Sequence, residues 1–369
     1  MRRRPRLRTG GGPALITGGA GFIGTNLAAR LLNDGRPVRI FDNLSRPGVE
    51  SNVAWLRRIY GDRVEICVGD IRDRDAVAAA LDGIAEVYHF AAQAGVTTSL
   101  VDPLDDFGVN AGGTLTLLEA IRAQPVPPSL LFTSTNKVYG DLENVELLPH
   151  DTRYLPADSD TRMWGISERR TIEFHSPYGC SKGAADQYVL DYARTFGLPA
   201  VVFRLSCIYG PHQHGNEDQG WVAHFVTCAL AAEPITIYGD GLQVRDLLYV
   251  DDLVDAMLTA QLSMPLVAGE AFNIGGGPER TTSLVELIKT IGRFNRARVA
   301  TDFKDWREAD QRYYVSDTRK FRKATGWMPT VGVRRGVASL YDWLRDRKDV
   351  ARLLSTGHAF AVPSRAALP

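Results

Sequence analysis

Two residues with complementary chemistry, Tyr178 and Lys182, stand four positions apart in the segment YGCSK. Residues at i and i+4 of a helix share one face, so the phenol and the ammonium would be neighbours. A nearby ammonium favours the phenolate and lowers the pKa of the tyrosine toward the working pH, where it can exchange protons. Of the 13 tyrosines, only Tyr178 has a lysine four residues later. The pair predicts an acid–base site, although alone it could equally be an incidental surface pair.

A third polar group, Thr135, follows the apolar run Leu130, Leu131, Phe132 and closes a predicted buried strand. A doubly wound sheet places its ligand crevice at such strand ends, which favours a joint role for Thr135 and Tyr178.

The two residues after Thr135 are Asn136 and Lys137, an amide and a cation. An amide cannot deliver a proton as a carboxylic acid does, and a lysine is normally protonated at neutral pH and is then a poor base. The pair therefore argues against acid–base elimination of water.

The segment TGGAGFIG (17–24) carries the glycine spacing of a dinucleotide-binding turn. Glycines allow the backbone to turn tightly and to approach a pyrophosphate held at a helix N-terminus. Asp42 ends the next predicted strand, where a carboxylate would bind the adenosine ribose. Because that carboxylate would repel the 2′-phosphate of NADP, NAD is the expected cofactor, although Arg46 nearby weakens this preference.

The elements that position these residues alternate between strand and helix. Apolar runs predict strands at 13–17, 37–41, 63–69, 85–90, 129–134 and 199–205. Helical patterns between them predict helices over 22–35, 73–82, 114–123 and 178–196. This alternation is typical of an α/β fold with a doubly wound parallel sheet of the Rossmann kind.

Domain boundaries follow from where this rhythm stops. We expect a dinucleotide-binding domain over 13–205, with return segments near 245–275, and a smaller α/β substrate-binding domain over 206–345. Helices are predicted to begin near Ser283, which forms a capping-box pattern with Glu286, and near Gly336. A disordered basic tail (1–12) and a C-terminal tail (346–369) complete the chain.

Composition narrows the function classes. Lysine plus arginine equals aspartate plus glutamate, 43 against 43, so no net charge favours nucleic acid or an anionic membrane. No apolar run is long enough for a membrane span. The four cysteines are scattered without metal-ligand spacing and are expected to be reduced thiols in the cytoplasm. No metal is expected, because the pair His212 and His214 has no further ligands beside it.

Taken together, the glycine turn, Asp42, Thr135 and YGCSK resemble the extended short-chain dehydrogenase/reductase superfamily, whose members mostly modify nucleotide sugars. The resemblance covers roughly residues 13 to 345. It implies that Tyr178 exchanges the hydroxyl proton, that Lys182 orients the cofactor ribose, and that Thr135 hydrogen bonds to the reacting oxygen. The 4,6-dehydratases of this superfamily carry Asp and Glu directly after the threonine, unlike Asn136 and Lys137 here.

The resemblance also implies two sets of binding residues. The expected NAD-binding residues are Gly18, Gly21, Phe22, Ile23, Gly24, Asp42, Asn43, Asp70, Ile71, Ala91, Tyr178 and Lys182, with Asn110 as a scaffold position. The expected substrate-binding residues are Thr97, Thr98, Ser99, Asn136, Arg204, Arg245 and Arg307. A guanidinium can bind two pyrophosphate oxygens at once, which suits the last two. Each arginine could instead be an ion-pair partner, and the residues at 97–99 could start a helix.

Longer stretches point to one group within the superfamily. They are FDNLSR (41–46), STNKVYGDLE (134–143), FHSPYGCSKGAADQY (174–188), DQGW (218–221) and QVRD (243–246). They are similar to members that invert C2 of a CDP-linked 3,6-dideoxyhexose with bound NAD, which implies an isomerase and a homo-oligomer. We expect the polar stretch 141–177 to help make the sugar pocket roomy.

The sequence leaves two other functions open. A C4-epimerase or another nucleotide-sugar oxidoreductase would use Tyr178 equally well. A non-catalytic dinucleotide-sensing protein could keep the fold, but the complete set of Thr135, Tyr178 and Lys182 argues against it.

Overall fold

The computed structural model of this chain describes residues 12–307 and 310–346. The two predicted tails fall outside the described residues, except for Gly12 and Asp346. Within the described ranges, no helix is both long enough and apolar enough to cross a membrane. The cytoplasmic location stays a prediction.

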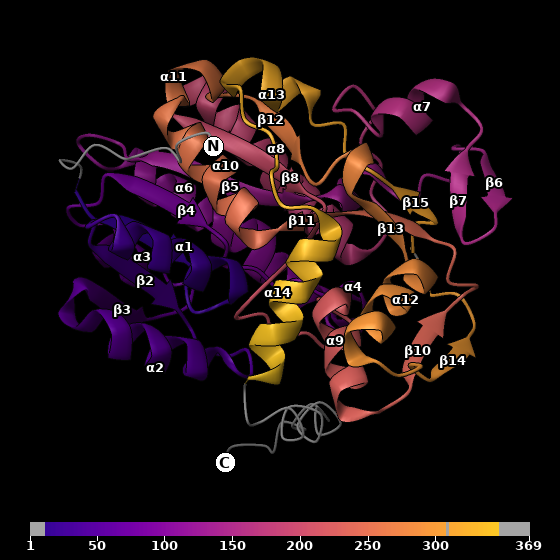
Figure 1. Ribbon diagram of the computed structural model, residues 1–369. Helices are drawn as coiled ribbons and strands as arrows, with labels where there is room; N and C mark the ends of the chain where they lie inside the picture. Colours follow the sequence, from indigo (N-terminus) through magenta and orange to yellow (C-terminus); the bar gives the residue numbers. More distant parts are fainter. Residues whose placement is uncertain (1–11, 308–309, 347–369) are drawn as a thin grey trace, which may run out of the picture.

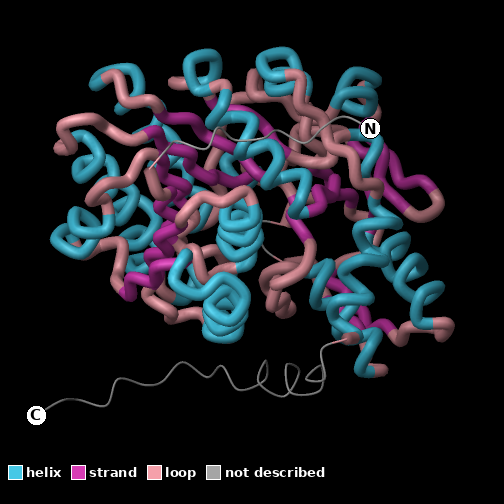
Figure 2. The backbone as a smooth tube through the Cα atoms, turned by 60° about the vertical axis from the view of Figure 1, so that its left-hand side comes forward, coloured by secondary structure: helices cyan, strands magenta, loops and turns pink. Residues whose placement is uncertain are grey.

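A seven-stranded sheet, parallel at every pairing, forms the centre of the molecule (Figures 1 and 2). Its order is β12-β8-β5-β4-β1-β2-β3, which confirms the doubly wound Rossmann-like prediction. The strands are β1 (Ala14–Thr17), β2 (Val38–Asp42), β3 (Val64–Val68), β4 (Glu86–His89), β5 (Ser129–Thr135), β8 (Ala200–Leu205) and β12 (Ala271–Ile274). From β1 the chain adds β2 and β3 on one side, and it then returns to add β4, β5 and β8 on the other side. The point between β1 and β4 where this order reverses is where such folds bind ligands.

Helices cover both faces of this sheet, as Figure 1 shows. One face packs against α1 (Phe22–Asn33), α2 (Val49–Tyr60), α10 (Val250–Leu262), α11 (Met264–Val267) and α13 (Arg319–Thr325). The other packs against α3 (Arg74–Ala80), α6 (Gly113–Arg122) and α8 (Pro177–Phe196). Because strands covered on both sides need apolar residues throughout, the central strands read as continuous hydrophobic runs in the sequence.

The predicted return to the sheet occurs only in part. Strand β12 joins β8 and helix α10 packs on the sheet, but β11 (Val244–Tyr249) belongs to a separate small sheet. There it pairs with β9 (Cys207–Tyr209), β13 (Thr281–Ser283) and β15 (Tyr313–Tyr314).

The second half of the chain adds its own core beside this small sheet. It contains α9 (Trp221–Ala231), α12 (Leu284–Asn295), α14 (Val333–Arg345) and the parallel pair of β10 (Ile235–Tyr238) and β14 (Thr301–Lys304). Helix α12 begins at the predicted capping box of Ser283 and Glu286. The two-domain division stays a prediction, which this separate core supports.

The polar stretch after β5 is more ordered than a loop. It forms the hairpin of β6 (Leu147–His150) and β7 (Arg153–Pro156), followed by α7 (Ser159–Trp164). Arg153 pairs with Glu286 on α12, so the hairpin is fixed to the second domain. Figure 1 shows it at the edge of the molecule, away from the centre of the large sheet.

A buried ion pair joins the sheet to α8. Arg204, on β8, donates two hydrogen bonds to Asp186 at 2.8 and 2.9 Å, and the side chains are only 6% and 1% exposed. Its third nitrogen donates to the Tyr139 hydroxyl at 3.1 Å, and that hydroxyl donates to Asn273 on β12. Arg204 is therefore a structural residue, which corrects the expectation that it faces the sugar.

We predict that Arg204→Met lowers the free energy of unfolding by about 3–5 kcal/mol, because it leaves the buried Asp186 carboxylate without its partner. Denaturant unfolding at neutral pH measures this loss. The matched control is Arg194→Met on α8, the helix that carries Asp186, since Arg194 is 72% exposed and pairs with Asp191 at 3.9 Å. It should change stability by less than about 0.5 kcal/mol. A loss below about 1 kcal/mol for Arg204→Met would contradict this account.

Candidate active site

A cavity of about 650 Å³ opens at the carboxyl ends of the parallel strands. Both halves of the chain line it: the turns after β1, β2, β4 and β5 on one side, and residues around β9 and the start of α9 on the other. This is the position at which a doubly wound sheet binds its ligand. None of the described residues lining the cavity comes from 141–177, so this segment does not supply the room that we expected of it.

The glycine turn forms the part of the wall nearest β1. Gly18 has φ +66°, and a Cβ atom there would lie 2.6 Å from the backbone nitrogen of Ala91. At Gly24 a Cβ atom would lie 2.5 Å from Gly19 Cα, so helix α1 could not pack against the turn. Any larger residue at either position would push the helix or β4 away from the cavity.

This wall fits a dinucleotide. Helix α1 begins after Gly21 with no side-chain cap, so the N–H groups of its first turn are not bonded to a capping side chain. Free N–H groups and the positive end of the helix dipole favour an anion such as a pyrophosphate. Most of the predicted cofactor residues line this cavity, namely Gly18, Gly21, Phe22, Ile23, Gly24, Asp42, Asn43, Ile71, Ala91, Tyr178 and Lys182.

Asp42 is held in place at the end of β2. Its carboxylate accepts backbone N–H groups from Ala20 at 3.0 Å and Leu44 at 2.9 Å. Burial raises its pKa, and these two hydrogen bonds oppose the shift. The carboxylate is therefore fixed where it can accept from a ribose hydroxyl.

Asp70 does not line the cavity, although its neighbours Gly69 and Ile71 do. Its carboxylate pairs with Arg72 at 2.7 Å, and the hydrogen bond from Arg72 lowers the pKa of Asp70 to about 2. Asn43 is 3.5 Å away, so Asp70 contacts the cofactor wall only through Asn43 and Arg72. The direct contact of Asp70 with the cofactor stays a prediction.

Thr135, Tyr178 and Lys182 line the same cavity, although they come from β5 and α8. Burial raises the pKa of Tyr178 to about 12, while its hydrogen bond with Thr135 acts to lower it and Asp106 to raise it. The predicted effect of Lys182 on the pKa of Tyr178 stays a prediction.

Lys182 is 3% exposed, and its Nζ lies 4.2 Å above the centre of the Phe132 ring. Burial lowers its pKa to about 7, against the opposing effect of Asp186 and Asp106. The ammonium and amine forms are therefore both accessible near neutral pH.

A polar cluster that was predicted only in part lies next to this lysine and holds α8 in place. Asp106 accepts from the Ser181 hydroxyl and, at 3.0 Å, from the Asn110 amide. Asn110 also donates to Gln93 O at 3.0 Å and contacts Ser181 Oγ at 3.0 Å, which fixes α8 against the segment after β4. Asn110 was expected as a scaffold position, whereas Asp106 lies too far from any motif to be recognised.

The residues at 97–99 do not line the cavity. They lie on α4 (Val96–Val101), where Thr98 is exposed and Ser99 is buried. The Ser99 hydroxyl donates to Val96 O at 2.7 Å and accepts the backbone N–H of Tyr178 at 3.1 Å. Ser99 therefore positions Tyr178, and the contacts of Thr97, Thr98 and Ser99 with the sugar stay a prediction.

Arg245 is buried beside the cavity but does not line it. It donates to Asp310 at 2.8 Å and to the Gln311 carbonyl oxygen, so the partners of its guanidinium are groups of the protein. The predicted pyrophosphate contact would require Arg245 to give up these partners.

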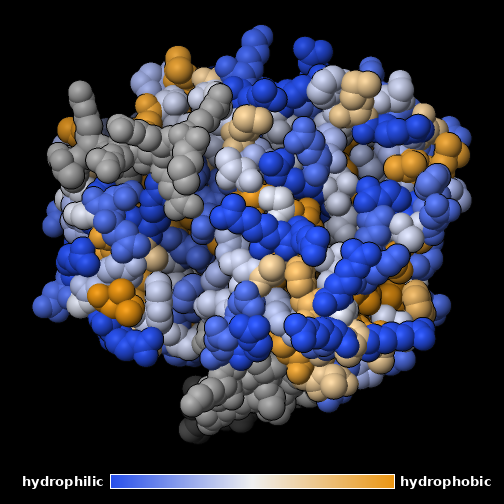
Figure 3. Space-filling view, viewed as in Figure 1, coloured by the Kyte–Doolittle hydropathy of each residue, from blue (hydrophilic) through white to orange (hydrophobic). Residues whose placement is uncertain are grey.

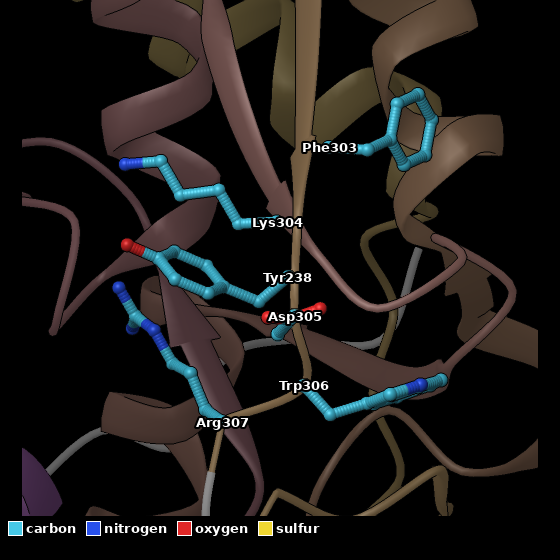
Figure 4. Close-up of a pocket in the computed structure, with 6 residues that line it drawn as sticks. All are labelled: Tyr238, Phe303, Lys304, Asp305, Trp306 and Arg307. Atoms are coloured by element: carbon cyan, nitrogen blue, oxygen red, sulfur yellow. The ribbon is translucent and has the colours of Figure 1, made fainter.

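Arg307 lines a second, open hollow of about 720 Å³, shown in Figure 4, and not the cavity. Its guanidinium lies 3.8 Å from the centre of the Tyr238 ring and pairs with Asp218 at 3.4 Å. Since Asp218 lines the cavity, Arg307 lies at the boundary between the two hollows.

Asn136 and Lys137, which follow Thr135 in the sequence, both line the cavity. Burial lowers the pKa of Lys137 to about 8, while Asp310, at 4.0 Å, acts to raise it. The opposite wall contains Cys207 and Trp221, which were not among the expected site residues and share an N–H···S hydrogen bond of 3.4 Å. Among the described residues, no group of three or more metal-ligating side chains is present.

Comparisons with known proteins agree with this geometry. The profile of the NAD dependent epimerase/dehydratase family matches residues 14–275. The chain is 43% identical over 338 residues to CDP-paratose 2-epimerase of Salmonella typhi, covering 89% of this chain and 98% of the relative.

Solved structures resemble the whole described fold. UDP-glucose 4-epimerase of Thermotoga maritima with UDP-glucose is 31% identical, with a TM-score of 0.77 over 90% of this chain and 98% of that one. UDP-glucuronic acid 4-epimerase of Bacillus cereus, in complex with UDP-glucuronic acid and NAD, is 27% identical with a TM-score of 0.77, covering 92% and 99%.

The buried lysine makes stability depend on pH. Because the pKa of Lys182 is about 7 in the folded protein, well below that of an exposed lysine, the unfolded chain binds more protons than the folded one above pH 7. Stability from this group is therefore gained as the pH rises from 7 to 9, by up to about 1.4 kcal/mol per pH unit.

Lys182→Met should remove this rise in the free energy of unfolding between pH 7 and 9. Denaturant unfolding of both proteins at pH 7, 8 and 9 gives the difference in slope. Lys320→Met is the control, since Lys320 is 39% exposed. It should keep the wild-type dependence of stability on pH. Parallel slopes for wild type and Lys182→Met would show that the lysine is not neutralised by burial.

Proposed function

The chain belongs to the NAD dependent epimerase/dehydratase family, and on that premise we propose that it inverts C2 of a CDP-linked 3,6-dideoxyhexose. It is a nucleotide-sugar epimerase, an isomerase with NAD as its cofactor. The observation that carries the C2 proposal is the 43% identity to CDP-paratose 2-epimerase over almost the full length of both chains. The wall below Thr135, with Asn136 and Lys137 in place of two carboxylates, supports epimerisation over dehydration.

The cofactor would be held by the glycine turn, by Asp42 at the ribose and by Tyr178 and Lys182 at the other end of the cavity. When bound, NAD accepts a hydride from the sugar carbon and returns it to the opposite face, chemistry that no side chain of the chain can supply.

The side chains then have to hold one hydroxyl and move one proton. Thr135 and Tyr178 line the same cavity and would bind the C2 hydroxyl between them. Tyr178 accepts the hydroxyl proton at its phenolic oxygen and later gives it back. Ser99 and Asp106 keep α8 in place while the sugar turns over.

The test is proton NMR of the purified enzyme with CDP-paratose in deuterated water and without added cofactor. We expect the C2-inverted sugar with its C2 hydrogen retained. Tyr178→Phe should lower the turnover by about 10²–10⁴-fold while the protein stays folded, because the proton acceptor is lost. Circular dichroism confirms the folding of the variant.

Three results would contradict the proposal. Deuterium at C2 would mean deprotonation instead of internal hydride return. Full activity of Tyr178→Phe would remove the acid–base role. No reaction with CDP-paratose but inversion of a UDP-hexose at C4 would favour the second candidate, a 4-epimerase, which the two solved neighbours support.

We also propose that the chain forms a homo-oligomer through an apolar face on α4, α5 (Pro103–Phe107) and α8. The exposed fractions of its hydrophobic side chains are Leu100 49%, Val101 76%, Leu104 83%, Phe107 60% and Tyr188 44%. Large exposed apolar faces of this kind mark association surfaces, and a second copy with the same face gives a closed pair. By contrast, the face in Figure 3 carries mostly hydrophilic residues with small hydrophobic groups between them.

Leu104→Glu should therefore weaken self-association by at least about tenfold, because each copy would bury a charge. Light scattering after size exclusion gives the mass, with one chain at 40.6 kDa. Val126→Glu is the matched control, since Val126 is also 83% exposed but lies outside this face. A monomeric wild type, or equal effects of both variants, would contradict this interface.

A further inference from the structure

Gln311 is a fully buried polar residue that no motif accounts for. It comes from the second half of the chain, just before β15, and reaches the turn that follows β5. Its Nε2 donates to Gly140 O at 2.5 Å and lies 3.5 Å from Asn136 O. Two carbonyl oxygens on one side require the nitrogen of the amide there, so the Gln311 oxygen faces the other way.

That oxygen determines how Asn136 is turned. Gln311 Oε1 accepts from Asn136 Nδ2 at 2.7 Å, so Asn136 Oδ1 faces Thr135. The Thr135 hydroxyl donates to it at 3.3 Å and accepts the backbone N–H of Lys137 at 3.2 Å. A chain of hydrogen bonds thus runs from Gln311 through Asn136 to Thr135.

Arg245 fixes Gln311, the first residue in this series of hydrogen bonds. Its guanidinium donates to the Gln311 carbonyl oxygen and to Asp310 at 2.8 Å. Arg245 pairs in register with Tyr314 on β15, so the segment that carries Gln311 is anchored to the small sheet. The second half of the chain therefore holds the side chain of Asn136, the residue next to Thr135.

We propose that Gln311 is a positioning residue that admits only a hydrogen-bond donor at position 136. A carboxylate there would face Gln311 Oε1 across the present distance of 2.7 Å, acceptor against acceptor. Gln311 cannot turn over, because its oxygen would then face Gly140 O and Asn136 O. Gln311 thereby keeps the Asn136 oxygen turned toward Thr135 and disfavours an ionised carboxylate at position 136. This inference rests on the proposed function for its meaning but not for its test.

Other titratable groups also surround position 136. They are Lys137 and Asp141 in the segment after Asn136, Tyr178 and Lys182 on α8, Cys207 on β9, Arg245 on β11 and Asp310 beside Gln311. The cations among them would lower the pKa of a carboxyl group introduced here, whereas Gln311 Oε1 would raise it. Only a comparison with and without that oxygen separates the two effects.

The test begins with Asn136→Asp. In its protonated form the new acid imitates the amide: it donates to Gln311 Oε1 and accepts from Thr135. We expect kcat/KM, divided by the wild-type value at the same pH, to fall about tenfold per pH unit above the pKa of the new carboxyl group. Stability relative to wild type should follow: because the folded pKa is raised, this stabilisation is present at low pH and is lost as the pH rises through it.

The matched control is the double variant Asn136→Asp, Gln311→Met, which keeps every charged group and removes only the amide. Its titration midpoint, from unfolding at a series of pH values, should lie lower by about one pH unit or more. Equal midpoints would overturn the proposal. If circular dichroism shows that the methionine variant does not fold, Gln311→Ser replaces it, since it also removes the amide without adding a charge and leaves room for water to hydrogen bond to the freed carbonyl oxygens. It too must lower the midpoint.

The two proposals fail separately. Unfolding needs no substrate, so the midpoints decide the role of Gln311 even if wild-type enzyme leaves CDP-paratose unchanged. A wild type that inverts the sugar, together with equal midpoints, would retain the proposed function and remove Gln311 from it.

Discussion

The close packing of the glycine turn after β1 against the start of the segment after β4 sets the position of everything else in the site. A Cβ atom at Gly18 would lie 2.6 Å from Ala91 N, so the turn and the segment after β4 can approach this closely only because this residue has no side chain. The start of α1, with its uncapped N–H groups, then points into the space between β1 and β4. Since the order of the sheet reverses at that point, the strand on the far side of β4 brings Thr135 to the same cavity.

Much of this half could be predicted because its signals are local. Parallel strands covered on both faces appear as apolar runs, and Tyr178 and Lys182 share a helix face, so spacing places them without a structure. Thr135 could be placed because a strand end in a doubly wound sheet lies at the crevice. All three line one cavity with the glycine turn.

The parts that could not be predicted depend on partners that are distant in sequence. Arg204 lies in an apolar strand, and only its contact with Asp186 on α8 shows that it is buried in an ion pair. Ser99 supports the backbone of Tyr178, a contact that no spacing rule gives. The hairpin within 141–177 has strands too short for a clear alternation, and its fixed position depends on the ion pair from Arg153 to Glu286.

The same distant contacts explain how one fold could carry out different reactions on a sugar. Thr135, Tyr178 and Lys182 are fixed by the nucleotide half and would serve any oxidation of a hydroxyl group. The side chain directly after Thr135 is held from the other half, where Arg245 fixes the segment that carries Gln311 and Gln311 fixes Asn136. A carboxyl group at position 136 would therefore be held in its protonated form, because only that form donates to Gln311 Oε1. The pKa of such an acid would be set by a residue from the other half of the chain.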